Sequence, residues 1–254
     1  MFCLFQLNGK IKNAILFLLT AVFVIPLSGA LFAPEWGLDG ERADTGRIRK
    51  ITEHFPQGDV VHIFDNQNRK ILRTFPDEKS RKKVENKMTY SSTGELEKVE
   101  IFIDGKLICT ETAVYDGGVL RRIIRNGSSE KDFLTTTMLV YDEKTSRLKM
   151  YGIQTPQGVI DYFYDRNPAG QVVYIRGFFK GKFNAGARYK YDSAGYITEV
   201  SRFNSRMQNA GILKNEWKLD KKGNWIEKKS SLYKKINEKP IFVEIVKRTV
   251  EYAE

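Results

Sequence analysis

The sequence predicts an all-β fold, in which tandem β-hairpins form a curled or spiralling antiparallel sheet behind an N-terminal hydrophobic helix. Three observations predict this fold. An aromatic residue followed by a turn residue recurs about every 26 residues from position 64 onward. The residues before each turn alternate in the way that strands with one buried face do. The chain holds 12 Tyr and 16 Phe but only 7 Pro, a composition typical of strands rather than of disorder.

The repeat is clearest at residues 189–195, Tyr-Lys-Tyr-Asp-Ser-Ala-Gly. Tyr189 and Tyr191 share one strand face. Asp192 can accept a hydrogen bond from a backbone N–H two residues on, and Gly195 supplies the positive φ of a bulged turn. Seven such units follow one another at intervals of 23 to 28 residues. The repeat-motif residues are Phe64, Asp65, Tyr90, Gly94, Tyr115, Asp116, Tyr141, Asp142, Tyr164, Asp165, Gly170, Tyr191, Asp192, Gly195, Asp220 and Gly223.

Each unit supplies two strands, and no unit can bury its own apolar face. Stacked units would therefore share one continuous core. Seven units give about fourteen strands, and open twisted sheets rarely exceed about ten without curling or splitting. This count predicts the curled or spiralling sheet. Residues 241–252 are predicted to form a final strand that covers the last unit, with charged residues that protect its exposed edge.

The Tyr-Asp-x-x-Gly element at this period resembles the YD (Rhs-type) repeat of bacterial secreted and surface proteins. It is present at 191–195 and, less strictly, at 219–225, and the resemblance covers roughly residues 60–254. In that family the repeats wind into a shell, sometimes around a toxin, and some members are described as carbohydrate-binding. This sequence is too short for a closed shell, and no cargo domain follows the repeats, so the resemblance favours a binding role over a toxin.

Residues 1–30 are predicted to be a signal peptide. Lys10 and Lys12 precede an apolar run from 14 to 25, and small residues before position 31 allow cleavage after Ala30. The alternative is an uncleaved membrane anchor over residues 14–33, which is long enough to span a bilayer. Residues 31–50 are predicted to be a linker, and residues 51–254 the repeat domain. The protein is thus expected to be exported to the periplasm or secreted, or else anchored by residues 14–33.

The inventory of reactive side chains predicts no catalytic residue, no metal site and no cofactor. The chain has only two histidines, His54 and His62, at a spacing that matches no recognised ligand pattern. Cys109 would be the only cysteine left after signal removal, and its strand-like surroundings favour a buried, inert thiol. The turn aspartates could form a row that binds Ca²⁺, but one carboxylate per unit is too sparse. Capping of each turn explains them better.

Aromatic residues outside the repeat positions are better candidates for ligand contact than the repeat tyrosines, which are expected to fill the core. The stretch from 178 to 183 combines aromatic rings with cations. The candidate ligand-contact residues are Phe178, Phe179, Lys180, Lys182, Tyr196 and Trp225.

Charge and export together suggest the partner. The formal net charge is +11, and loss of residues 1–30 with Lys10 and Lys12 would leave +9. Export argues against nucleic acid, so the expected partners are an envelope glycan or anionic surface polymer, or a protein. The leading hypothesis is an exported, non-enzymatic binding or scaffold module of the bacterial envelope. The alternative is a protein–protein accessory or neutralising module of a secreted toxin system.

Overall fold

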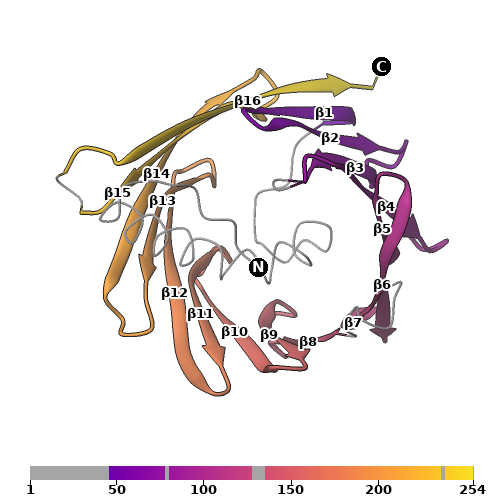
Figure 1. Ribbon diagram of the computed structural model, residues 1–254, viewed down its shortest axis with the longest axis horizontal. Helices are drawn as coiled ribbons and strands as arrows, with labels where there is room; N and C mark the ends of the chain where they lie inside the picture. The colour runs from indigo at the N-terminus through magenta and orange to yellow at the C-terminus, as the bar shows by residue number, and fades with distance from the viewer. Residues whose placement is uncertain (1–45, 78–79, 128–134, 236–237, 254) are drawn as a thin grey trace.

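In a computed structural model, the described part of the protein forms a closed barrel of sixteen antiparallel strands (Figure 1). The structure describes residues 46–77, 80–127, 135–235 and 238–253. The predicted signal peptide or anchor, with its hydrophobic helix, and most of the predicted linker lie outside the described residues. The first strand begins at Ile48, within the predicted linker.

The strands follow one another around the barrel in chain order, each paired with the strands before and after it. Their bounds are β1 Ile48–Phe55, β2 Gly58–Phe64, β3 Lys70–Pro76, β4 Lys83–Tyr90, β5 Leu96–Ile103, β6 Lys106–Asp116, β7 Val119–Gly127, β8 Thr135–Tyr141, β9 Leu148–Thr155, β10 Gly158–Arg166, β11 Val172–Phe179, β12 Lys182–Tyr191, β13 Ile197–Phe203, β14 Asn209–Leu219, β15 Trp225–Tyr233 and β16 Phe242–Tyr252.

Closure of the barrel corrects the prediction of a curled or spiralling sheet. β16 does not cover an open edge, because it pairs with β1 over Ile51↔Val250, Thr52↔Thr249 and Glu53↔Arg248. The seven predicted hairpins supply β2 to β15, and β1 and β16 complete the circle. A pairing between first and last strands satisfies the backbone groups that two open edges would leave exposed. Among the described residues no helix is long and apolar enough to cross a membrane.

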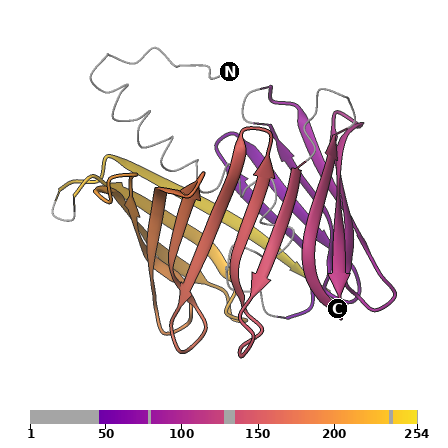
Figure 2. The ribbon, with the colours of Figure 1, turned by 90° about the horizontal axis from the view of Figure 1, so that it is seen from below.

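The seven repeat turns all lie at one end of the barrel, which we call the repeat rim; the other end is the opposite rim (Figure 2). A β-bulge lies next to each repeat turn, for example between Lys190 and Tyr191, and in the Tyr164 unit it lies two residues later, between Asp165 and Arg166. Four of the turn aspartates, Asp65, Asp142, Asp192 and Asp220, cap their turns as predicted, whereas Asp165 pairs with Arg176 and Asn167 caps that turn. Asp192 Oδ1 accepts hydrogen bonds from the backbone N–H groups of Ala194 and Tyr196, both within 2.9 Å. Gly195 has a φ of 90°.

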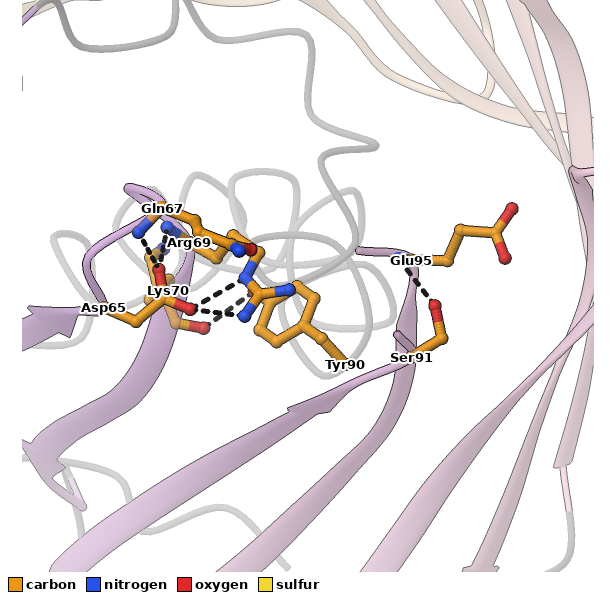
Figure 3. Close-up of polar contacts among 7 residues, drawn as sticks. All are labelled: Asp65, Gln67, Arg69, Lys70, Tyr90, Ser91 and Glu95. Carbon is orange, nitrogen blue, oxygen red and sulfur yellow. Dashed lines mark hydrogen bonds and ion pairs between the residues drawn. The ribbon is translucent and has the colours of Figure 1, made fainter. Parts of the chain in front are cut away.

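Repeat tyrosines also connect neighbouring hairpins. The Tyr90 hydroxyl donates to the carbonyl of Lys70 in the preceding hairpin at 2.7 Å, as Figure 3 shows. Tyr191 donates to Val172 O at the same distance. Figure 3 also shows Asp65 accepting from Gln67 and Arg69 in the first turn. The tyrosine therefore joins one repeat to the one before it, while the aspartate shapes its own turn.

The two faces of the wall differ in burial. Met88, Val99 and Glu111 lie opposite one another on β4, β5 and β6, and all three are buried. Side chains on the convex face of a single curved sheet diverge, so only the concave face can bury them this completely. The buried rows therefore face the inside of the barrel. They form two apolar clusters, one over β3–β6 and a larger one over β7–β12 that includes Tyr151 and Tyr162.

The outward face carries ion pairs between residues that face each other on adjacent strands. Lys190 and Glu199 lie 2.9 Å apart, Lys218 and Glu227 2.6 Å, and Lys50 and Glu251 2.7 Å. Opposite charges directly across a ladder stabilise the pairing of strands. The outward face is thus largely polar, although it also carries exposed apolar residues such as Met138, Val140, Val243 and Ile245.

Candidate functional site

The reactive side chains in the described part of the chain do not form a metal centre. Cys109 is buried, with a guanidinium nitrogen of Arg125 3.1 Å from its Sγ. His54 lies between Asp59 (3.0 Å) and Thr249 (3.3 Å), in the order of a carboxylate–imidazole–hydroxyl triad. This set stands on the outward face of β1, β2 and β16, whose backbone N–H groups pair between the strands. Without N–H groups directed at a substrate oxygen it has no oxyanion hole.

A second charged group lies on the inward face where the barrel closes. Glu53 on β1 faces Arg248 on β16, and its carboxylate is 3.8 Å from Nε2 of His62 on β2. Burial alone would raise the pKa of Glu53. The neighbouring His62 and the charges of Arg248 and Lys228 outweigh burial and hold this pKa below its ordinary value of 4.5.

This lowered pKa predicts acid sensitivity of the closure. A carboxylate with a lowered folded-state pKa contributes stability that is present above 4.5 and is lost as pH falls through the lowered value. We expect the free energy of unfolding to fall in this window. Urea unfolding from neutral to acidic pH measures this loss. Glu53→Gln should show a smaller acid-induced loss than the wild type, and equal losses would contradict the assignment.

The structure separates the six predicted ligand-contact residues. Tyr196 is buried, and its hydroxyl donates to the carbonyl of Gly223 at the repeat rim. Trp225 contacts Trp217 edge-on, at 5.6 Å between ring centroids, and lies under Arg248 at 4.2 Å. These two aromatic residues connect neighbouring hairpins and strands, Tyr196 to the turn at Gly223 and Trp225 to Arg248 on β16. The other four, Phe178, Phe179, Lys180 and Lys182, lie at or near the β11–β12 turn at the opposite rim.

Phe178 belongs to a group of outward-facing rings and guanidinium groups on β10–β13. Its ring meets Phe163 at 5.4 Å and Phe183 at 5.7 Å, both edge-on. Tyr174 meets Phe203 edge-on at 6.3 Å. We call this group the aromatic–arginine patch. Its members are Phe163, Tyr174, Arg176, Phe178, Phe183, Arg188 and Phe203.

Two arginines are held in the patch in different ways. Arg176 forms an ion pair with Asp165 at 2.7 Å. The guanidinium of Arg188 lies over two rings, 5.0 Å from Tyr174 and 5.2 Å from Phe203, and Arg188 is exposed. Contact with two rings restricts the motion of this guanidinium, while its N–H groups can still bond to a ligand. Arg188 is thus positioned to bind a carboxylate in an aromatic setting.

A glycine lies at the centre of the patch. Gly186 stands opposite Arg176 on one side and Phe203 on the other. A Cβ at this position would lie 3.1 Å from the Tyr174 ring and 3.3 Å from the Phe183 ring. The absence of a side chain therefore lets the two rings approach each other over the strand.

Sequence reasoning missed most of this patch. Phe163, Arg176, Arg188 and Phe203 are spread over four strands and 41 positions of the chain. Only the register of the barrel places them on one surface. Strand alternation could have identified one member of the patch. Ala187 and Tyr189 face inward, so the side chain of Arg188, which lies between them, faces outward.

Comparisons with known proteins bear on the fold alone. No protein-family model and no curated protein matches the chain. A porin-like protein from Bacteroides uniformis ATCC 8492 is similar in structure, with a TM-score of 0.56 at 10% sequence identity, over 82% of this chain and 99% of that one. This likeness agrees with a barrel rather than with an open repeat sheet.

Two other solved structures align more weakly. A porin-like protein from Bacteroides vulgatus ATCC 8482 has a TM-score of 0.39 at 9% identity, over 82% of this chain and 99% of that one. The Photorhabdus luminescens Tc holotoxin pore has a TM-score of 0.32 at 17% identity, over 68% of this chain and 9% of that one. None of these descriptions names a YD repeat or carbohydrate binding. The carbohydrate-binding expectation that came with the family resemblance is therefore not supported and is withdrawn.

Proposed function

We propose that this protein is an exported, non-enzymatic binding module of the bacterial envelope that docks a protein partner on the aromatic–arginine patch. The observation that carries the proposal is Arg188, which is exposed and lies over the rings of both Tyr174 and Phe203. Aromatic residues and arginine are enriched at protein interfaces, and they supply most of the residues whose truncation costs binding energy. A partner that offers a carboxylate beside an apolar side chain would fit this surface.

The closed barrel favours recognition through side chains. A sheet with an open edge can bind an extended peptide as an additional strand. Here β1 and β16 pair with each other, so the sheet offers no such edge. The outward ion pairs also argue against a wall embedded in lipid, because a membrane barrel needs an outward apolar band about 25 Å tall. A water-facing wall with one aromatic patch suits docking better than it suits a channel.

The barrel is compatible with a location in the cell envelope. The finer assignment, periplasmic or secreted rather than anchored by residues 14–33, is part of the proposal. Cell fractionation with intact-mass measurement tests it separately. A soluble species that begins at Leu31 would support export with cleavage, and a full-length species in the cytosol would contradict export.

Photo-crosslinking in cells tests the docking proposal. A photo-reactive residue in place of Ser201, which faces Arg188 across β12 and β13, should give one discrete protein adduct. Arg188→Glu should lower the adduct yield at least about tenfold, because charge reversal at an interface repels the partner's carboxylate. The same photo-reactive residue in place of Arg122, exposed on β7, is the matched control and should give no such adduct. Equal yields from both positions, or no effect of Arg188→Glu, would contradict the proposal.

A further inference from the structure

The two rims of the barrel differ in chemistry although hairpins build both. At the repeat rim the turns present small and polar residues such as Ser193, Ala194 and Gly195. At the opposite rim, the hairpin tips from β9 to β16 present large apolar residues that are 37–54% exposed. These are Val159, Phe179, Met207, Ile241 and Phe242.

Cations flank these apolar residues on the same tips. Lys180 and Lys182 adjoin Phe179, and Arg206 precedes Met207. Lys234, Lys235 and Lys239 lie in the β15–β16 connection, and Glu238 is the one acidic residue among its described positions. All six cations are exposed. We call this sector of the opposite rim the apolar–cationic rim.

Backbone conformation supports a functional role for these tips. Met207 has a φ of 59°, in the left-handed region that favours glycine. Its turn has the same hydrogen bonds as the repeat turns, with Asn204 Oδ1 accepting from Arg206 N and Gln208 N. Repeat turns place Gly94, Gly195 or Gly223 at the equivalent position. Met207 therefore holds a strained backbone conformation while its long apolar side chain is half exposed. Backbone strain of this kind is concentrated at functional sites.

We propose that the apolar–cationic rim docks the barrel on an anionic lipid membrane. Side chains from several separate tips can enter the interface of a bilayer together, because a bilayer is a continuous surface. Lysine and arginine extend apolar stems with charged ends, which reach anionic headgroups while the neighbouring apolar side chains insert. Two features favour an anionic membrane as the partner. The rim cations complement the negative headgroups, and the apolar tips are too far apart along the rim to form one compact pocket. Docking at the rim leaves Arg188 on the side wall. The patch adjoins the rim at Met207, whose Sδ lies 4.0 Å from the Tyr174 hydroxyl, so separate variants test the two proposals.

A depth measurement tests the orientation in the full chain. In a Cys3→Ser background, an environment-sensitive fluorophore is attached to a cysteine that replaces Phe179, or to one that replaces Leu219. Cys109 is 3% exposed, so the new cysteine is the accessible one. Leu219 is 41% exposed at the repeat rim and serves as the matched control. On phosphatidylcholine vesicles containing phosphatidylglycerol, a lipid-soluble quencher should quench the Phe179 label and not the Leu219 label. Equal quenching of both labels, or of neither, would overturn the proposal.

Charge reversal tests the electrostatic part on the same vesicles. Lys180→Glu with Lys182→Glu should weaken the partition coefficient by about tenfold to hundredfold. Lys144→Glu with Lys149→Glu makes the same change in net charge on the repeat rim, where both lysines are exposed, and should have a much smaller effect. Added salt should weaken binding of the wild type more than that of the rim variant. If both pairs weaken binding equally, attraction comes from net charge alone and the proposed rim is wrong.

Discussion

Replacement of Tyr162 by alanine should destabilise the barrel by about 3–5 kcal/mol, the range for truncation of a large buried aromatic residue. Tyr162 is 2% exposed and belongs to the larger inward cluster. Its ring stacks on Tyr151, with 4.8 Å between centroids. On its other side the backbone of Gly177 makes room, because a Cβ there would lie 3.2 Å from the ring. The surrounding wall is fixed by strand pairing, so it can close only part of the cavity that alanine would leave.

Urea unfolding followed by circular dichroism measures this loss. Phe179→Ala is the matched control, since it truncates a 37% exposed aromatic residue at the end of the adjacent strand β11. It should cost within about 1 kcal/mol. A Tyr162→Ala variant no less stable than Phe179→Ala would mean that the inward cluster does not stabilise the fold.

The hairpin content of this fold could be predicted from the sequence because its determinants are local. A turn that needs Asp192 and Gly195 carries its signal within four residues. The bulge before Tyr191 and the cap from Asp192 lie where the repeat places them. Such features depend on backbone geometry and on hydrogen bonds between near neighbours, so they can be seen in one unit at a time.

Closure could not be predicted in the same way, because it depends on a contact between Ile51 and Val250 at opposite ends of the repeat array. No local signal distinguishes a last strand that protects an edge from one that pairs with the first strand. Curvature accumulates from small twists at every strand pair, and the sum decides whether the ends meet. The candidate site depends on the same register, so Arg188 and Phe203 could not be joined from their spacing alone.

The seam between β1 and β16 provides a direct test of closure, because it holds one charged pair on each face. On the inward face Glu53 lies opposite Arg248, which is 7% exposed and donates from Nε to the carbonyl of Trp225. Arg248→Leu should destabilise the barrel by about 1.5–3 kcal/mol, because it removes the charged hydrogen bond to the Trp225 carbonyl and a positive charge near Glu53. On the outward face Lys50 and Glu251 form a pair with side chains 38% and 46% exposed. Lys50→Leu should change stability by about 1 kcal/mol or less.

Both charged pairs join the same two strands, so a comparison of the pairs separates the effect of burial from that of strand identity. Addition of Glu53→Leu to Arg248→Leu should recover part of the loss, since it removes the uncompensated carboxylate. Addition of Glu251→Leu to Lys50→Leu should recover little. Urea unfolding of seven chains, namely the wild type, the four single variants and the two double variants, gives both double-mutant cycles. Similar losses for Arg248→Leu and Lys50→Leu would contradict an inward-facing Arg248, and with it the assignment of the buried rows to the inside of a closed barrel.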